Sequence, residues 1–492
     1  MAYVAYVTNL KNLRKHPNAD RLQLAECFGN TVCVNMDYTA DQLGVYFPTD
    51  GQLSMEFCEQ NGLLAVYVDG VNVSGGYMDP EKRNVKTIKL RGEKSDGLFL
   101  PLTCLAYTGV DITTFKAGDT IALVNGHEIC TKYIPKRNPR RSGGNGAEGN
   151  RTRKKKVAVA PLFMEHADTE QLAYNLDAFK PGDLIEITLK MHGTSQRTAN
   201  LPRFDGYKRT FMDRIMRREG VAQYNWGSVS GTRRVVLDNY DGGYYGSNEF
   251  REAHSKFFDG KLHKGETVYY EVVGFTTSGS SIMGDADNKK LKDKEFVKLY
   301  GPTTVFSYGC EPTGKKTMYG QDDKGAFEIE IAVPQSDIYV YRMTMTNEDG
   351  DVVEYTPDFM RYRCEQMGAK TVPVFAKGHI CMDGSVSWVN MLTGEDMTTA
   401  IGDEVRENDP YSFEFNPGDS VKAVAEQFYD GPDPIGKTHV REGVVVRIVN
   451  RPKFAAYKHK NFSFKVLEGI IKEVADAPDM EEAQDVVDNG EE

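Results

Sequence analysis

The chain has 492 residues, of which 40% are hydrophobic and 27% charged, and its formal net charge is −11. This length exceeds a single ordinary hydrophobic core and predicts a globular protein of two or three domains. Because no stretch approaches the roughly 20 consecutive apolar residues that cross a bilayer, the sequence excludes a helical membrane protein.

Residues 1–135 are expected to form one mostly β domain. The segment from Met1 to Thr8 is short and alternating, so it predicts a strand rather than a signal peptide. Further strands are predicted at Thr31–Val34, Leu63–Val68 and Thr120–Val124, between turns rich in Gly, Asp and Asn. Short strands at this spacing are typical of a small β-barrel.

Two segments differ from the rest in charge. Residues 136–156 are dense in Lys and Arg and contain a Gly-rich run, which predicts a flexible basic linker. It is either a solvated spacer or an electrostatic clamp on a phosphate backbone. Residues 473–492 are strongly acidic and lack aromatics, so we expect a disordered tail. A local basic patch therefore matters more for phosphate attraction than the acidic total.

The eight cysteines lie far apart and include no C-x-x-C pair. This spacing disfavours a zinc ribbon or a redox dithiol. Buried free thiols are typical of a reducing compartment, so we expect a cytoplasmic protein.

Residues 157–472 predict an α+β domain. Helices are expected at Asp168–Asn175, Glu249–Phe258 and Pro357–Met367, the first capped by Asp168 or Thr169. The predicted strands are Leu184–Leu189, Val268–Val273, Val305–Tyr308, Asp337–Met345, Gly443–Val449 and Phe462–Leu467. The stretch from about 310 to 440 is long and poorly patterned, so we expect it to hold an insertion.

Lys190 lies where a predicted strand ends in the turn Met191-His192-Gly193. A lysine amine can act as a nucleophile when desolvation or a neighbouring cation favours its uncharged form. Gly193 allows the backbone to approach a ligand closely, and Thr194 supplies a hydroxyl donor. These residue types suit attack on a phosphate.

Six segments in chain order resemble the motifs of the covalent nucleotidyltransferases. They are Lys190-x-His-Gly-Thr-Ser195, Ser230-Gly-Thr-Arg233, Tyr270-Glu-Val-Val-Gly274, Val340-Tyr-Arg-Met343, Glu442-Gly-Val-Val-Val-Arg447 and Lys458-His-Lys-Asn-Phe462. The histidine form of the first motif resembles that of ATP-dependent RNA ligases. The resemblance implies antiparallel, ATP-grasp-like sheets with helices.

Three further segments resemble one RNA ligase branch, which carries an OB-type RNA-binding module before the catalytic domain. They are His16-Pro-Asn-Ala-Asp-Arg-Leu22, the run from Leu90 to Pro101, and the run from Phe163 to Leu172. The resemblance implies that the barrel at 1–135 is OB-like. We expect Arg14, Lys15, His16, Arg21, Tyr38 and Tyr46 to face RNA, and Arg91, Lys94 and Ser95 to grip the break.

The resemblance implies a mechanism through a lysyl-AMP intermediate. Lys190 would attack ATP, AMP would pass to an RNA 5′-phosphate, and a 3′-hydroxyl would then seal the break. Nearby Lys458, Lys460 and a Mg²⁺ or Mn²⁺ ion would favour the free amine of Lys190. The implied nucleotide-binding residues are His192, Gly193, Thr194, Arg233, Glu271, Tyr341, Lys458 and Lys460.

Glu442 and Glu271 are the implied metal residues, because carboxylates with water suit Mg²⁺. Glu271 is also a candidate for the ribose, and Tyr341 for stacking on adenine. The sequence departs from common patterns at Leu189, where many RNA ligases have glutamate, and at Arg447, where lysine is common. Lys465 competes with Lys460 for the last motif.

The expected substrate is RNA or an RNA-containing duplex with a 3′-hydroxyl/5′-phosphate break, as in RNA repair. No obligate protein partner is evident. One alternative is a GTP-dependent guanylyltransferase, which His192 disfavours. Another is a non-catalytic RNA- or tRNA-binding protein, which Lys190, Glu271, Glu442 and Lys460 together disfavour.

Overall fold

A computed structural model describes residues 3–68, 71–76, 78–133, 159–216, 220–237, 240, 245, 247–382, 385–397 and 416–475. The chain divides into two compact units. Unit 1 comprises residues 1–137 and 465–478, and unit 2 comprises residues 138–464 and 479–492. The predicted basic linker and almost all of the predicted acidic tail lie outside the described residues. In the described part of the chain, no helix is long and apolar enough to cross a membrane.

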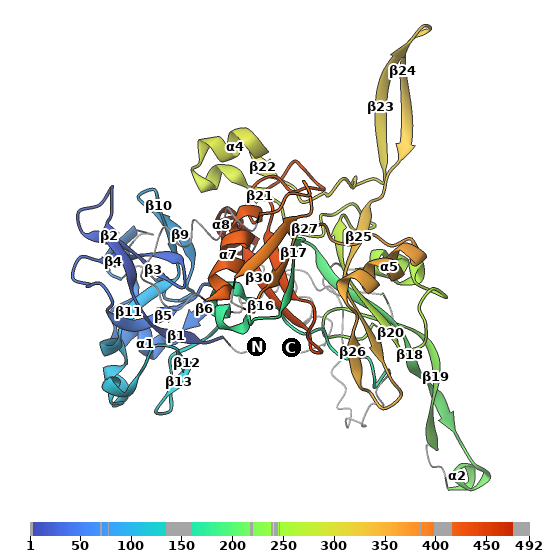
Figure 1. Cartoon of the computed structure of the whole chain (residues 1–492), viewed down its shortest axis with the longest axis horizontal. Coiled ribbons are helices and arrows are strands. Elements are labelled where there is room, and N and C mark those ends of the chain that lie inside the picture. Colours follow the sequence, from blue (N-terminus) through green and yellow to red (C-terminus); the bar gives the residue numbers. More distant parts are fainter. Residues whose placement is uncertain are drawn as a thin grey trace. The chain divides into compact units, whose positions relative to one another are not determined.

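Unit 1 is built from short antiparallel strands around one apolar core (Figure 1). A four-stranded sheet has the order β11-β5-β1-β12, and a three-stranded sheet has the order β2-β3-β4. The core contains Val7, Val45, Phe47, Phe57 and Leu105, all fully buried. Between the described residues, hydrogen bonding divides these strands into separate sheets, none of which is a closed barrel.

The strands of unit 1 are β1 (Ala5–Asn9), β2 (Lys11–Lys15), β3 (Leu22–Cys27), β4 (Asn30–Asn35), β5 (Leu43–Phe47), β6 (Gly51–Leu53), β7 (Ala65–Val68), β8 (Val71–Gly75), β9 (Thr87–Leu90), β10 (Glu93–Asp96), β11 (Leu98–Pro101), β12 (Thr120–Ile121), β13 (Leu123–Val124), β14 (His127–Glu128) and β15 (Cys130–Lys132). Its helices are α1 (Met55–Gln60), η1 (Leu102–Thr108) and η2 (Ile112–Thr114). The single strand predicted at Thr120–Val124 is therefore two strands, which belong to different sheets.

Two side chains expected to face RNA are instead part of the interior of unit 1. His16 is 1% exposed, and its imidazole contacts the Leu90 carbonyl and accepts from the Asn18 N–H. Tyr46 is also 1% exposed and donates its hydroxyl to the Asp96 carbonyl. Their polar atoms are satisfied by backbone groups, so both predictions were wrong. All eight cysteines are free thiols, and six of them are buried.

Unit 2 contains two antiparallel-rich sheets that share a continuous chain segment. The first sheet has the order β16-β30-β29-β17-β27-β28, and the second has the order β19-β18-β20-β25-β26. β17 (Leu184–Lys190) ends in the first sheet, and β18 (Thr194–Lys208) begins in the second. The turn Met191–Gly193 thus carries the chain from one sheet to the other.

The other strands of unit 2 are β16 (Glu170–Gln171), β19 (Val221–Gly231), β20 (Glu266–Gly274), β21 (Ala286–Asp287), β22 (Thr303–Thr304), β23 (Lys315–Asp322), β24 (Gly325–Ala332), β25 (Ser336–Thr346), β26 (Val352–Glu354), β27 (Val374–Ile380), β28 (Val386–Asn390), β29 (Gly443–Ile448) and β30 (Ala455–Lys460). Its helices are η3 (Leu172–Tyr174), η4 (Leu176–Ala178), α2 (Phe211–Ile215), α3 (Glu249–Phe257), η5 (Asn288–Leu291), α4 (Lys294–Tyr300), α5 (Pro357–Met367) and α7 (Pro417–Phe428). α8 (Phe462–Ala475) begins in unit 2 and continues into unit 1.

Much of the stretch from 310 to 440 belongs to the two sheets of unit 2. β25 pairs along its length with β20, and β27 pairs with β17, so this stretch completes both sheets. Two hairpins extend away from these sheets (Figure 1). One is β23–β24, and the other is formed by β18 and β19 beyond the pairing of β18 with β20. The sequence pattern did not predict β23 and β24, because most of their residues are exposed on both faces.

Three predicted elements were wrong. The segment from Asp168 is not a helix capped there, because the Asp168 carboxylate is paired with Arg233 and Arg234 and the first 3₁₀ turn starts at Leu172. Val305–Tyr308 is not a strand, since the strand ends at Thr304. Phe462–Leu467 is the first part of α8: the Asn461 side chain accepts from the Phe464 N–H, which is a helix-capping contact.

Candidate active site

Strand register places two of the predicted lysines beside one glutamate. Lys190 pairs with Gly443 across β17 and β29, and Gly443 pairs with Lys460 across β29 and β30. Glu442 immediately precedes Gly443, so both lysines flank its side chain. Gly443 has φ 148°, and a Cβ there would lie 2.1 Å from the His459 carbonyl oxygen. Only glycine permits this close strand pairing.

The carboxylate of Glu442 is the centre of a buried charge cluster. Its Oε1 lies 2.8 Å from Lys190 Nζ and 3.3 Å from Lys460 Nζ. Its Oε2 lies 3.2 Å from His192 Nδ1. The Glu442 side chain is 3% exposed, whereas that of Lys190 is 22% exposed, so the lysine is the more accessible of the two.

Opposing effects act on the Glu442 carboxyl. Burial by itself raises its pKa, but the cations of Lys190 and Lys460 and the hydrogen bond with His192 outweigh burial. The net result holds the pKa of Glu442 well below its usual value. Glu442 is therefore ionised throughout the physiological pH range.

His192 is fixed in the turn from two sides. Its backbone N–H donates to the Tyr308 hydroxyl at 2.7 Å, and its ring is packed edge-on against Phe306 and Phe464. Burial raises the pKa of Tyr308 well above its usual value, so this hydroxyl stays neutral. The imidazole is thereby held with Nδ1 toward Glu442.

Gly193 brings the turn against the second sheet. A Cβ at this position would lie 2.4 Å from the Val272 carbonyl oxygen and 2.9 Å from Cγ of Glu271. The side chain of Glu271 therefore lies directly beside the turn. Glu271 is 9% exposed and pairs with Ser195 and Tyr339 in the sheet. The turn thus brings the second predicted carboxylate close to the segment that carries Lys190.

Gly193→Ala tests this close approach. The added methyl group meets a backbone oxygen that cannot move without disturbing β20, and overpacking of this kind costs about 1–3 kcal/mol. We expect urea unfolding to show a loss of about 2 kcal/mol. Gly227→Ala is the control, because Gly227 likewise has no positive φ and a Cβ there meets nothing within 4 Å. Equal losses in the two alanine variants would contradict the packing argument.

Tyr341 occupies a β-bulge. Tyr269 pairs with Arg342 and Tyr270 with Val340, so Tyr341 is the extra residue in β25. A bulge redirects a side chain from the regular alternation. The Tyr341 hydroxyl lies 2.9 Å from Ser195 Oγ, close to the start of β18, and its ring contacts His166. The structure thus places Tyr341 near the turn that follows Lys190.

His166 lies among cations, yet it is neutral. Burial, followed by the guanidinium groups of Arg342, Arg233 and Arg197, lowers the pKa of His166 well below its usual value. Its Nδ1 is 2.9 Å from Arg342 Nη1, which can only donate, so Nδ1 accepts. The Phe163–Leu172 segment is thereby attached to the strand that carries Tyr341.

The remaining predicted residues lie around this centre with other partners. Thr194 Oγ1 accepts from Arg251 Nη2 at 2.6 Å, and Arg233 Nη1 donates to Asp168 at 2.9 Å. Lys458 lies two residues before Lys460 on β30, so both side chains project from the same face of the sheet. Lys465 contacts Asp96, and both belong to unit 1. Lys460, rather than Lys465, is the lysine beside Glu442.

The carboxylates present fit a hydrated divalent cation better than a fully protein-ligated one. Within the described ranges, no group of three or more His, Cys, Asp or Glu side chains is placed to hold a metal. Mg²⁺ usually keeps several waters and takes one or two carboxylates together with substrate phosphates. Glu442 and Glu271, on either side of the turn, match that donor set.

No protein-family model and no curated protein sequence matches the chain. Solved structures do. An apo lysine-to-alanine mutant of a Naegleria gruberi RNA ligase has a TM-score of 0.51 at 15% identity, over 96% of this chain and 99% of that chain. A second mutant of Naegleria gruberi RNA ligase, with ATP and Mn, has a TM-score of 0.50 at 15% identity, over 97% and 99% of the two chains. The chain therefore shares the fold of these RNA ligase structures.

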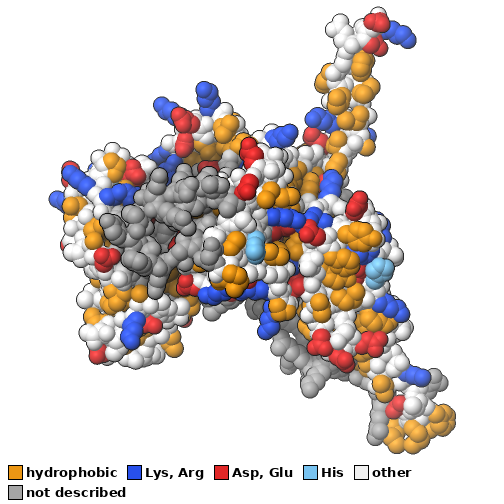
Figure 2. Space-filling model, in the orientation of Figure 1, with side chains coloured by type: hydrophobic (Ala, Val, Ile, Leu, Met, Phe, Trp, Pro, Cys, Tyr) orange, Lys and Arg blue, Asp and Glu red, His pale blue; other side chains and the backbone are white. Residues whose placement is uncertain are grey.

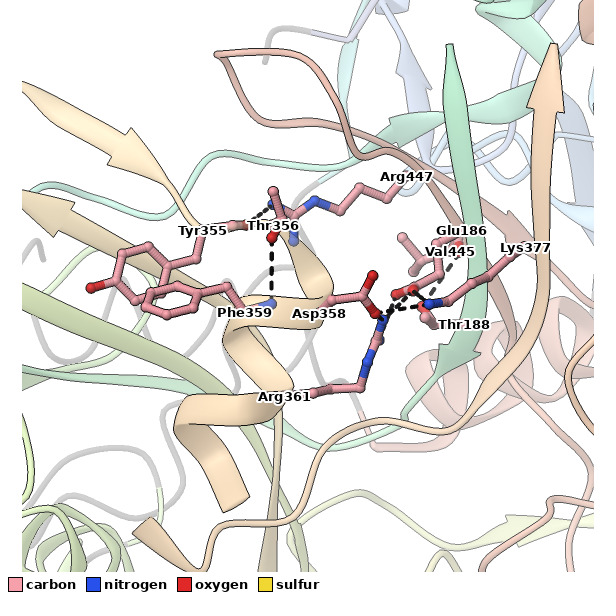
Figure 3. Close-up of polar contacts among 10 residues, drawn as sticks. All are labelled: Glu186, Thr188, Tyr355, Thr356, Asp358, Phe359, Arg361, Lys377, Val445 and Arg447. Atoms are coloured by element: carbon pink, nitrogen blue, oxygen red, sulfur yellow. Dashed lines mark hydrogen bonds and ion pairs between the residues drawn. The ribbon is translucent and has the colours of Figure 1, made fainter. Parts of the chain in front are cut away.

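Within this RNA ligase fold, α5 connects the two sheets. Arg361 makes two hydrogen bonds to Glu186 of β17, at 3.0 and 2.7 Å. Arg363 makes two to Glu266 of β20, at 2.8 and 2.7 Å. Figure 3 shows Arg361 directed at Glu186, with Asp358 and Lys377 beside the pair. α5 thus holds the strand of Lys190 relative to the strand of Glu271.

Arg361→Ala is expected to lower the free energy of unfolding by about 3 kcal/mol, because it leaves the buried Glu186 carboxylate without its bidentate partner. The Glu186 side chain is 6% exposed, and the remaining Lys377 Nζ is 4.0 Å away. Asp358→Ala is the control, since that side chain is 77% exposed and is expected to contribute less than about 1 kcal/mol. Urea unfolding that ranks the two variants in the opposite order would contradict this assignment.

Sequence reasoning did not single out Tyr308, Arg251, His166 or the Arg361–Glu186 pair. Only the structure distinguishes Tyr308: its backbone has a positive φ of 49°, which is rare for an aromatic residue. His166 and Glu186 each lie near a quoted motif, but their partners are more than 170 residues away in sequence. Such pairs leave no local pattern to detect.

Proposed function

We propose that the protein is an ATP-dependent RNA ligase that acts through a lysyl-AMP intermediate. The observation that carries this proposal is the convergence of Lys190, Glu442, Lys460 and His192 at the turn between the two sheets. Glu271 of β20 and Tyr341 of β25 lie beside this turn and the start of β18. The RNA ligase fold supports the proposal, and the motif resemblance supplies the residue roles.

In the proposed first step, Nζ of Lys190 attacks the α-phosphorus of ATP and pyrophosphate leaves. A phosphoramidate bond forms as the bond to the bridging oxygen breaks. The amine must lose a proton before it attacks, and an adjacent carboxylate opposes that loss. The cationic Lys460 beside Lys190 would favour the neutral amine, and Glu442 would hold a divalent cation when one is bound.

The proposed metal residues are Glu442 and Glu271, with water and phosphate oxygens completing the shell. A bound Mg²⁺ or Mn²⁺ neutralises phosphate charge during in-line transfer. Lys460 and Lys458 would hold phosphate oxygens by charge from the same sheet face. The roles proposed for these chain residues are binding and orientation, since positioning dominates phosphoryl transfer.

The nucleoside would lie against β18 and the bulge of β25. Tyr341 is proposed to stack on adenine, and its hydroxyl contact with Ser195 fixes the ring orientation. His192, Gly193 and Thr194 would contact AMP through the turn. Arg233 is proposed to bind ribose or phosphate, although it is held by Asp168, and that ion pair would have to open.

AMP would then pass to a 5′-phosphate, and a 3′-hydroxyl would attack the resulting anhydride to seal a break, as in RNA repair. We propose residues 1–135 as an OB-like RNA-binding module, 136–156 as a basic hinge, 157–472 as the adenylation domain and 473–492 as an acidic tail. Arg14, Lys15 and Arg21 are exposed basic residues of unit 1 suited to the RNA backbone. The proposed location is the cytoplasm.

One labelling experiment separates the proposed function from its rivals. The protein is incubated with ATP or GTP labelled at the α-phosphate, in Mg²⁺ or Mn²⁺, and then with an RNA duplex containing a 3′-hydroxyl/5′-phosphate nick. We expect a labelled adduct from ATP only, release of label on adding RNA, and joined RNA. An adduct from GTP alone supports a guanylyltransferase. RNA binding without any adduct supports a non-catalytic protein.

A further inference from the structure

One hairpin of unit 2 extends well beyond the sheet to which it belongs. β18 pairs with β20 only from Thr194 to Ala199, whereas it pairs with β19 as far as Lys208. Residues 203–216 and 220–226, which we name the β18–β19 arm, form a two-stranded ribbon that carries α2 (Figure 1). Among the described residues these strands pair with no third strand, and the arm touches the rest of unit 2 where the Phe204 N–H donates to the Val159 carbonyl.

The arm is basic although the chain is acidic. Its described residues include four Lys or Arg and two Asp or Glu, against a net charge of −11 for the whole chain. Lys208 and Arg209 are exposed at the point where the ribbon meets α2. A local basic surface sets attraction to phosphates regardless of total charge.

Apolar and aromatic side chains accompany these charges at the tip. Phe211 is 77% exposed, Met212 56% and Ile215 61%. Figure 2 shows this end of the hairpin covered by hydrophobic side chains with a basic one beside them. The helix is only five residues long, which is too short to lie in a membrane interface as an independent amphipathic element.

A β-bulge gathers aromatic rings on one face of the arm. Phe204 pairs with Tyr224 and Gly206 with Gln223, so Asp205 is the extra residue. The bulge shifts the alternation by one, and Tyr207 reaches the face of Phe204 and Tyr224. The ring centroids of Phe204 lie 5.2 Å from Tyr207 and 5.9 Å from Tyr224.

This face ends in accessible rings. Tyr207 is 38% exposed and Tyr224 37% exposed. Trp226, two residues beyond Tyr224, is only partly exposed and packs against the apolar cluster that contains Phe163 and Leu201. Exposed aromatic rings in a row beside basic residues form the surface on which unpaired bases stack, whereas paired bases do not offer their faces.

We propose that the β18–β19 arm binds a single-stranded RNA segment remote from the break. This inference depends on the proposed ligase function only in assuming that the bound RNA contains a 3′-hydroxyl/5′-phosphate break. β18 is continuous from Thr194, beside the candidate active site, to Lys208, a span of about 45 Å at about 3.3 Å per residue. The arm thus selects substrates in which an unpaired strand extends from the duplex that carries the nick.

The test compares two nicked RNA duplexes that differ only in an unpaired extension. The extension has about 20 nucleotides, enough to span the arm at about 3.4 Å per nucleotide. Dissociation constants are measured by fluorescence anisotropy with the full chain and with Lys208→Ala/Phe211→Ala. The matched control is Lys315→Ala/Tyr319→Ala, which removes an exposed lysine and a 76% exposed tyrosine from the β23–β24 hairpin.

We expect the arm variant to weaken binding of the extended substrate about tenfold or more, since one stacked base is worth about 1–3 kcal/mol. Binding of the substrate without extension should not change, and the control variant should match the unmodified chain on both. Equal loss on both substrates, or no loss on the extended one, overturns the proposal. The proposal is also overturned if the arm variant loses binding to vesicles of anionic lipid while its binding to RNA is unchanged.

A second readout separates this proposal from the proposed function. Formation of the labelled AMP adduct requires no RNA, so the arm variant should form it at the rate of the unmodified chain. If the unmodified chain forms no adduct, the ligase proposal fails, whereas the binding comparison still decides the role of the arm. Lys208→Arg/Phe211→Tyr should restore binding of the extended RNA, and its failure to do so contradicts a stacking role.

Discussion

Replacement of Lys190 by alanine is expected to abolish the labelled AMP adduct, with a loss of at least about 10³-fold, because no other described amine takes its place as nucleophile. Lys190 Nζ is the partly exposed member of the cluster, and the neighbouring Lys460 is attached to the adjacent strand β30. The measurement is protein labelling from ATP labelled at the α-phosphate. A labelled Lys190→Ala protein would contradict the assignment of the nucleophile.

Two controls separate chemistry from structure in this experiment. Lys190→Arg retains a cation beside Glu442, but a guanidinium does not deprotonate and should not form the adduct. RNA that already carries a 5′-adenylyl group bypasses the nucleophile, so both variants should still join it. Failure to join that RNA, together with normal folding, would show that Lys190 acts in the later steps as well.

Glu442→Gln is expected to lower adduct formation by about 10²–10³-fold, a range typical for loss of one preorganised electrostatic group. The same change breaks a buried pair and should cost about 3 kcal/mol of unfolding free energy. The Glu442 carboxylate contacts Lys190, Lys460 and His192, and its side chain is 3% exposed. Glu426→Gln is the matched control, because that glutamate pairs with His459 and Lys422 at the side of the same sheet but is 42% exposed.

The pH dependence of this stability difference has a definite sign. The pKa of Glu442 is lowered in the folded protein, so its contribution is fully present above the usual value of 4.5 and is lost as the pH falls below it. The glutamine variant has no such carboxyl. Urea unfolding should therefore give a constant difference between the two proteins from pH 7 to about pH 5 and a shrinking difference below. A difference that grows on acidification would contradict the ion pairing.

The local elements were largely predictable because each carries its own signals. The helix predicted at Pro357–Met367 is α5 with identical bounds: Thr356 caps it, Pro357 occupies its first turn and Gly368 ends it in a left-handed conformation. The capping contact of Asn461 carries the same kind of signal, yet the alternation of Phe462 and Phe464 outweighed it and a strand was wrongly predicted. A single polar cap competes poorly with two aromatic residues at strand spacing.

The candidate site was predictable as a set of residues but not as a geometry. The motifs indicated Lys190 and Glu442, which lie 252 residues apart, and only strand register shows that Gly443 brings them together. The bulge at Tyr341 and the choice of Lys460 over Lys465 depend on how β25 and β30 pair. Those pairings arise from tertiary packing, which overrides local propensity.

The two arginines of α5 have a mechanical consequence. They clamp one glutamate in each sheet, so a rotation between the sheets would have to break two bidentate contacts at once. Unit 2 should therefore behave as one stiff body, in which the distance between β17 and β20 across the Met191–Gly193 turn stays constant. Accommodation of a nucleotide would then be confined to rotamer changes of Lys190, Glu442 and their neighbours, and hydrogen exchange in β17 and β20 should stay slow throughout turnover.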